Sequence, residues 1–201
     1  EITIKRAVWS RLTNADDQIV SLPNNEIWYT STDGAVVSPT TTQGFGADYV
    51  SNTYEDGMGV IKFDGPITTI PSSAFRDCAT LQSVTHMGTE LSSINYGAFS
   101  GCSNLSSVEL PESLLSIGGS AFHNTVLVEV TIPESVESIG TDSFKQDDVQ
   151  RTLQAFYGKG ASEDHLSLVI NGVLVAVARM DDPLDLSLDR KSGSAGMPRP
   201  I

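Results

Sequence analysis

The residues of this chain that could perform chemistry are few and scattered. His86, His123 and His165 lie far apart, and no serine or cysteine stands in a nucleophile motif such as Gly-x-Ser-x-Gly. The stretch Gly158-Lys-Gly160-Ala-Ser162 lacks the order of a phosphate-binding loop, and Gly44-Phe-Gly46 lacks the third glycine of a dinucleotide fingerprint. We therefore expect no catalytic residue and no cofactor, and both glycine-containing stretches are interpreted as turns.

Acidic pairs are the remaining candidates, in this case for metal binding. Asp16-Asp17, Asp147-Asp148 and Asp181-Asp182 could supply carboxylates to calcium, but none lies in a loop with interleaved oxygen ligands. Solvated charge on loops is the favoured interpretation. No metal site is predicted, although calcium binding stays open.

The regular spacing of four phenylalanines indicates the repeated elements of which the chain is built. Each follows an isoleucine by five residues, and the pattern recurs at steps of 24, 23 and 22 residues: Ile70 and Phe75, Ile94 and Phe99, Ile117 and Phe122, Ile139 and Phe144. A unit of this length cannot bury its own apolar face, so successive units stack into a solenoid. Function is therefore expected on a surface rather than in a pocket.

One repeat shows the expected local structure. In Leu105-Ser-Ser-Val108-Glu-Leu110-Pro111, the period of two turns Val108 and Leu110 inward and turns Ser107 and Glu109 toward solvent. Proline ends the strand because it has no amide hydrogen for a parallel ladder. The Ala-Phe pair that follows predicts a turn or short helical corner with the phenylalanine in the core. A partial unit on Ile61-Lys-Phe63 and Ile67 is expected to begin the array, which gives about four turns over residues 59–148.

The pattern Ile-Pro-x-Ser-Val-x-x-Ile-Gly-x-x-Ala-Phe-x-x-Cys-x-x-Leu resembles the BspA-like class of leucine-rich repeats, found in surface proteins of gut and oral anaerobic bacteria. The resemblance is specific from Gly59 to Phe144, and the stretch from Asn25 to Gly65 looks like the leader that often precedes such repeats. It implies a β-rich solenoid of short parallel strands with turn or 3-10 corners. It also implies a secreted or surface-attached binding protein, with adhesion as the usual proposal and no catalytic residues.

Two β-hairpins are predicted to flank the repeats. The first, in the N-terminal segment 1–58, pairs the strand from Ile27 with Ala35–Val37 around Gly34, and we expect it to cap the open end of the solenoid. The second, in segment 149–180, reverses at Asn171-Gly172 and either caps the other end or extends the binding face. In the last segment, 181–201, Leu184–Leu188 alternates like an edge strand, and a disordered tail is predicted beyond it.

Cys78 and Cys102 occupy the same position of adjacent units, so stacking would place their backbones about 4.8 Å apart, within the disulfide range. Side chains in a stacked ladder run parallel rather than converge, and Thr125 takes the same position in the next unit. We therefore expect small buried side chains and free thiols rather than a disulfide.

The formal net charge of −13, from 25 acidic against 12 basic residues, argues against nucleic acid as a partner. No run of 18 apolar residues predicts a membrane span. The chain begins with Glu1 rather than Met, which is compatible with a secretory signal segment outside this numbering. The expected localisation is therefore extracellular or at a cell surface.

The outward residues of the repeat strands form the predicted binding face: Ser83, Thr85, Ser107, Glu109, Glu129 and Thr131. Four strands give this face a footprint of roughly 250 Å², against about 800 Å² for each partner of a standard interface. It contains hydroxyls and carboxylates and no aromatic side chain, which suits a polar or basic partner. The sequence thus favours a non-catalytic extracellular module that binds a host or microbial surface protein or glycan; the alternative is an architectural spacer or self-association element with no ligand of its own.

Overall fold

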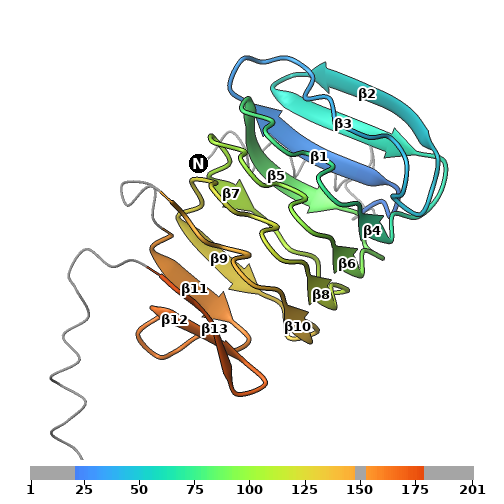
Figure 1. The fold of residues 1–201 in the computed structure, drawn as a ribbon. Coiled ribbons are helices and arrows are strands. Elements are labelled where there is room, and N and C mark those ends of the chain that lie inside the picture. Colours follow the sequence, from blue (N-terminus) through green and yellow to red (C-terminus); the bar gives the residue numbers. More distant parts are fainter. Residues whose placement is uncertain (1–20, 148–152, 179–201) are drawn as a thin grey trace, which may run out of the picture.

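The computed structural model describes residues 21–147 and 153–178, and Figure 1 shows these residues as a stack of short strands. They contain no helix. The thirteen strands of the described residues are β1 (Glu26–Ser31), β2 (Tyr49–Glu55), β3 (Met58–Phe63), β4 (Thr69–Ile70), β5 (Leu81–Met87), β6 (Ser93–Ile94), β7 (Ser107–Val108), β8 (Ser116–Ile117), β9 (Glu129–Ile132), β10 (Ser138–Ile139), β11 (Ala155–Gly158), β12 (Ser167–Ile170) and β13 (Val173–Val177).

Two parallel ladders form opposite sides of the solenoid (Figure 1). On one side, the isoleucine that precedes each phenylalanine is in register with its counterpart in the next unit, through β4, β6, β8 and β10. On the other side, β5 pairs with β7, and β9 pairs with β11. Between these two pairs the stack continues through the hydrogen bond from Val126 N to Leu105 O, 3.0 Å long. The predicted solenoid of about four turns is therefore confirmed.

A column of phenylalanine rings runs along the core between the two ladders. The rings of Phe75, Phe99, Phe122 and Phe144 stack with centroids 5.1, 5.2 and 5.5 Å apart and planes within 3° of parallel. Phe45 closes one end of the column edge-on and Phe156 closes the other. All of these rings are buried, which confirms the predicted place of the repeat phenylalanines in the core.

The corners that hold these rings are turns, without the 3-10 helix offered as an alternative, in the residues that the structure describes. In each unit, the residue two before the phenylalanine has left-handed backbone, with φ between 54° and 60°: Ser73, Gly97, Ser120 and Asp142. A second left-handed residue follows the phenylalanine in three units, at Asp77, Gly101 and Asn124. Glycine and short polar residues tolerate this conformation best, which explains the small, polar composition of the corners.

The N-terminal end departs from the predicted hairpin. Strand β1 does not pair with residues 35–37; it lies between β3 and β5, antiparallel to both. Its residues Ile27, Trp28 and Tyr29 are all buried, so the strand has apolar side chains on both faces and belongs inside a sheet rather than at the edge of one. Gly34, with φ of 69°, does form a turn, but the chain beyond it continues as a loop.

The hairpin at this end is instead β2–β3, which reverses at Asp56 and Gly57. Strand β3, which contains the Ile61-Lys-Phe63 part of the predicted partial unit, does not join the parallel ladder, because β1 lies between β3 and β5. Ile61 nevertheless lies in the core, and the ladder of the solenoid does begin at β4.

The C-terminal end contains the second predicted hairpin. Strands β12 and β13 pair antiparallel around Asn171 and Gly172, whose φ values of 52° and 77° fit a two-residue turn, so this prediction is confirmed. The predicted edge strand Leu184–Leu188 and the tail after it lie outside the described residues, as do residues 1–20.

Candidate binding face

The four strands β5, β7, β9 and β11 position the candidate binding face. Ser107, Glu109, Glu129 and Thr131 are exposed, and Thr85 is partly exposed, as the period of two predicted. Beneath them Val84, Val108, Val130 and Ile132 are buried in the core. The stack of units thus holds polar side chains from separate repeats on one surface.

Ser83 is the exception, because only 8% of its surface is exposed. Strand β1 lies beside β5 at this end, and Thr30 faces Ser83 across the pair with their hydroxyl oxygens 2.7 Å apart. The hydroxyl is therefore engaged within the sheet. We use the name strand face for the accessible residues Thr85, Ser107, Glu109, Glu129 and Thr131 together with Tyr157, which is described next.

The added residue, Tyr157, comes from β11, which lies in the segment 149–180, where only the hairpin around Asn171-Gly172 was predicted. This strand pairs in parallel with β9 and sets Tyr157 beside Thr131. The ring of His165 lies 4.5 Å from the ring of Tyr157, and His165 Nδ1 donates to the carbonyl of Phe156 over 3.1 Å. The strand face therefore has an aromatic side chain that the sequence analysis missed.

A signal for this strand was present in the sequence. Leu153-Gln-Ala-Phe156 repeats Leu127-Val-Glu-Val130 at a distance of 26 residues, close to the repeat length, with phenylalanine in place of valine. In the structure Leu153 and Phe156 are buried in the core like their counterparts. The missing Ala-Phe corner around this segment concealed its membership of the stack.

A groove of about 320 Å³ opens at the other end of the strand face. Thr85, His86 and Glu109 contribute polar groups to it, and Leu22 and Leu110 contribute apolar walls. Partial burial raises the pKa of the Glu109 carboxyl above its ordinary value. Among the described residues no basic side chain forms an ion pair with Glu109, so a cation from outside would relieve this cost.

His86 forms the buried wall of this groove. Its Nε2 donates to the carbonyl of Pro23 over 2.6 Å, and its ring lies 4.9 Å from the ring of Trp28. Burial lowers the pKa of His86, and the bond to Pro23 opposes that change. The side chain is therefore a neutral, fixed part of the wall near pH 7 rather than a competing cation for Glu109.

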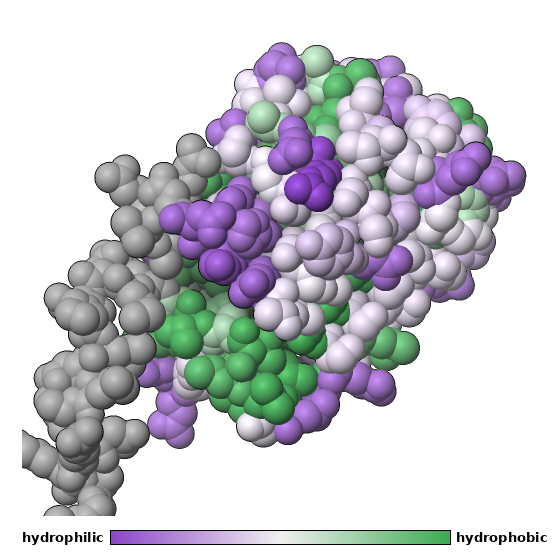
Figure 2. All heavy atoms as spheres, viewed as in Figure 1, coloured by the Kyte–Doolittle hydropathy of each residue, from purple (hydrophilic) through white to green (hydrophobic). Residues whose placement is uncertain are grey.

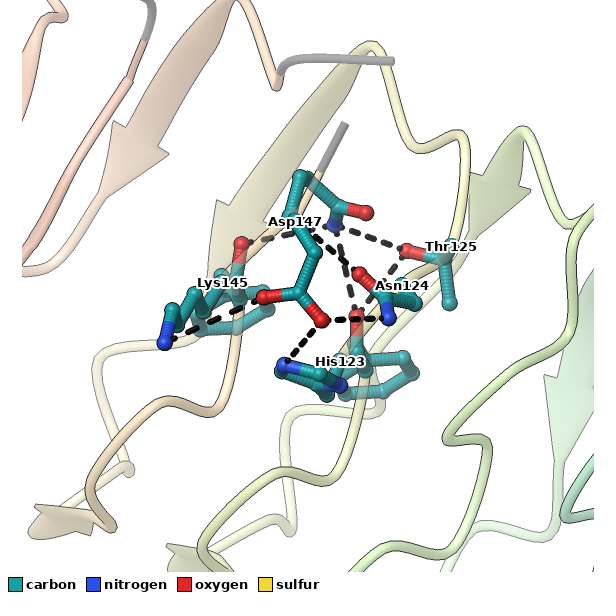
Figure 3. A network of polar contacts seen from close by, with 8 residues as sticks. His123, Asn124, Thr125, Lys145 and Asp147 are labelled. Atoms are coloured by element: carbon teal, nitrogen blue, oxygen red, sulfur yellow. Dashed lines mark hydrogen bonds and ion pairs between the residues drawn. The ribbon is translucent and has the colours of Figure 1, made fainter. Parts of the chain in front are cut away.

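A polar network joins the last two corners of the solenoid (Figure 3). Asn124 Nδ2 donates to Asp147 Oδ2 and receives a bond at Oδ1 from the Asp147 amide, each 2.8 Å long. His123 Nε2 and Lys145 Nζ lie 3.5 and 3.9 Å from the Asp147 carboxylate. These contacts, above all the bond from Asn124, lower the pKa of Asp147. His123 is partly covered, and Asp147 lies against it and connects two units.

Of the two cysteines predicted to be buried, Cys102 is buried and Cys78 is partly buried. Both are free thiols, and Cys102 is fully buried with Sγ 2.9 Å from the carbonyl of Phe75 in the preceding unit. Burial raises the pKa of the Cys102 thiol strongly. The described residues contain no cluster of three potential metal ligands, and they include no helix long and apolar enough to cross a bilayer.

Comparison with known proteins assigns the repeat region. A family model described as the BspA type leucine-rich repeat region matches residues 54–150 in six copies. A leucine-rich repeat protein of T. pallidum is 28% identical over 47% of this chain and 54% of that protein, with a TM-score of 0.37. One from Bacteroides capillosus is 25% identical over 70% of this chain and 98% of its own, with a TM-score of 0.41. A leucine-rich cell surface protein of Faecalibacterium prausnitzii is 16% identical over 80% of this chain and 59% of its own, with a TM-score of 0.29. No curated protein matches the chain.

Proposed function

Residues 54–150 of this chain belong to the family of BspA-type leucine-rich repeats, and from that premise we propose a non-catalytic binding module that acts at a bacterial cell surface. It recognises a surface protein or glycan of a host or of a neighbouring microbe through the strand face. Repeat arrays of this kind offer extended surfaces rather than enclosed pockets, and such surfaces serve recognition.

The observation that carries this proposal is the state of Glu109. Glu109 is exposed overall, but it lines the groove together with Thr85, where partial burial raises the pKa of its carboxyl, and the described residues supply it with no cationic partner. A lysine, arginine or amino-sugar group of a partner would fill that role. The apolar groove walls formed by Leu22 and Leu110 would contact the aliphatic part of such a group.

Tyr157 supports recognition at the opposite end of the strand face. Its partly exposed ring lies beside that of His165, and Glu129 and Thr131 on the adjacent strand supply acceptors and a hydroxyl. An aromatic ring flanked by hydrogen-bonding groups can contact either the apolar side of a sugar or an aromatic side chain of a protein. Glu109 and Tyr157 thus lie at opposite ends of one surface, which favours an elongated partner.

The proposal is tested by binding of the purified chain to an array of extracellular-matrix proteins, mucins and bacterial glycans. The Glu109→Lys/Glu129→Lys variant should lose saturable binding while its thermal unfolding stays unchanged. A matched control, Glu55→Lys/Glu137→Lys, makes the same change of charge at exposed positions away from the strand face and should bind like the wild type.

Two results would contradict the proposal. Equal loss of binding in both variants would mean that only net charge matters, and retained binding in the Glu109→Lys/Glu129→Lys variant would exclude the strand face. If neither the wild type nor the two variants bind anything on the array, the alternative of an architectural spacer is favoured.

A further inference from the structure

The β12–β13 hairpin and the residue before it contain much of the exposed apolar surface. Of the thirteen large apolar residues that are exposed in the described part of the chain, five lie between residues 166 and 177: Leu166, Val169, Val173, Leu174 and Val177. Figure 2 shows apolar side chains gathered at this end of the molecule. The other eight are distributed over the rest of the described surface.

The pairing of the two strands shows how this face is built. Val169 lies opposite Leu174, and Ser167 lies opposite Val177, so Val169, Leu174 and Val177 share one side of the hairpin, whereas Val173 lies opposite Ile170 and belongs to the other side. Leu168 and Ile170 point to the other side, where they are buried against the solenoid. The hairpin is thus apolar on both faces, although its solvent face contacts nothing in the described structure.

The edge of β13 is a less favourable site for association with another molecule than the solvent face of the hairpin. The register between β12 and β13 shifts between Leu168 and Val169, so Val175 is an extra residue that bulges from the strand. A bulge twists an edge and discourages another strand from pairing with it. The exposed face is not affected in this way, because its side chains point away from the sheet.

We propose that two copies of this chain associate through the solvent faces of their β12–β13 hairpins, related by a twofold axis. The occupant is inferred from charge: with a net charge of −13, two copies repel each other over most approaches, whereas residues 166–178 contain no charged side chain. A neutral apolar face is complementary to its own copy, as a twofold interface requires.

The size of the patch sets the strength of this association. The three side chains of this face, Val169, Leu174 and Val177, are exposed over 39%, 59% and 42% of their surface and give an apolar area on the order of 250 Å², about a third of the ~800 Å² that each partner buries in a standard interface. The dimer should therefore be weak and should form only at high protein concentration. At a cell surface, a pair of copies would present two strand faces to one multivalent partner and bind it more tightly than one copy does.

Sedimentation velocity of the full chain, measured from about 1 µM to about 1 mM, tests the proposal. The wild type should shift from monomer to dimer, and added salt should strengthen the dimer because it screens repulsion between the acidic copies. Leu174→Lys/Val177→Lys should weaken association at least about tenfold, since each dimer would then confine four added charges at an apolar contact.

The matched control is Val50→Lys/Tyr96→Lys, which changes two similarly exposed apolar residues, one on β2 and one in the turn after β6, and should dimerise like the wild type. All changed positions are exposed, and thermal unfolding at low concentration checks that each variant is folded. Three results would overturn the proposal: a wild type that is monomeric throughout, a control that loses association equally, and a dimer that salt dissociates. The first result would also leave the patch to another occupant, such as residues 184–188 or a different protein.

Discussion

The two ends of the solenoid are closed in different ways. At the N-terminal end, β1 is inserted into the sheet between β3 and β5, and both faces of this strand are buried: Ile27 and Tyr29 toward the core, and Trp28 with Met58 and Val60 on the other side. At the C-terminal end, the β12–β13 hairpin buries Leu168 and Ile170 but exposes Leu174 and Val177. At the N-terminal end, the closing strand is part of the sheet and both of its faces are buried. At the C-terminal end, the hairpin covers the solenoid but leaves one of its own apolar faces exposed.

The hydrogen bonds at the N-terminal end are also more deeply buried than the one that ties the hairpin to the solenoid. The Tyr29 hydroxyl donates to Asn52 over 2.7 Å and accepts from the amide of Val37 over 3.0 Å, so three separate segments converge on one buried side chain. The hairpin is tied to the solenoid by exposed contacts such as the bond from Asn171 Nδ2 to the carbonyl of Glu137, 2.9 Å long. The comparison shows that insertion of a strand buries both of its faces, while addition of a hairpin leaves one apolar face exposed.

The largest effect is expected from the ring column that connects both ends. Phe99→Ala should lower the free energy of unfolding by about 3–5 kcal/mol, because it removes a fully buried ring that stacks on Phe75 and Phe122. Urea denaturation of the variant measures this change. A loss below about 1 kcal/mol would mean that the two ends are stabilised independently of the column.

A smaller effect, confined to the N-terminal end, is expected for Gly59→Ala. A Cβ at Gly59 would lie 2.1 Å from the ring of Tyr29, so the ring and its bonds to Asn52 and Val37 must shift. We expect a loss of about 1–3 kcal/mol in urea denaturation. Hydrogen exchange should show the loss of protection in β1–β3 first, and equal loss in β12–β13 would contradict the local character of this end.

At the C-terminal end the corresponding glycine change should cost less. Gly172 has open space around it, and only its φ of 77° opposes a side chain. Gly172→Ala should therefore destabilise the hairpin by about 1 kcal/mol, which hydrogen exchange at β12 and β13 would measure. A cost as large as that of Gly59→Ala would show that the hairpin is coupled to the solenoid as tightly as β1 is.

The smallest predicted effect concerns Glu109 and pH. Its folded-state pKa is raised, so the stability linked to this carboxyl is present below its unfolded pKa and is lost as pH rises through its folded pKa. Glu109→Gln should consequently be as stable as the wild type or slightly more stable at neutral pH, and this difference should shrink in acid. Thermal unfolding of both proteins between about pH 3 and about pH 7 checks the sign. Greater stability of the wild type at neutral pH would mean that Glu109 has a favourable partner within the fold.

The repeat region is the part that the sequence predicted best. Ile117 and Phe122 recur with their neighbours at a nearly constant step, and each unit meets only the units next to it, so one local pattern determines both the packing of Phe122 and the register of Ile117. The Asn171-Gly172 hairpin was predictable for a similar reason, because the turn itself selects which residues pair.

The binding face was only partly predictable. The outward positions of Glu109, Glu129 and Thr131 follow from the period of two within each strand. The period cannot show whether another segment lies beside a strand, and for that reason it gave no indication that Ser83 is buried against Thr30. Tyr157 was missed because its strand lacks the corner residues by which the other units are recognised.

The sequence by itself determined the stacked units, the phenylalanine core, the free cysteines and the C-terminal hairpin, because each depends on neighbours at a fixed spacing along the chain. Only the tertiary structure decided that β1 lies between β3 and β5, that β11 extends the strand face, and that the hairpin exposes Leu174. These features depend on which sheet edge a distant segment meets. Which edge a segment joins depends on the surface that the whole chain buries, and this cannot be derived from the periodicity of a local stretch of sequence.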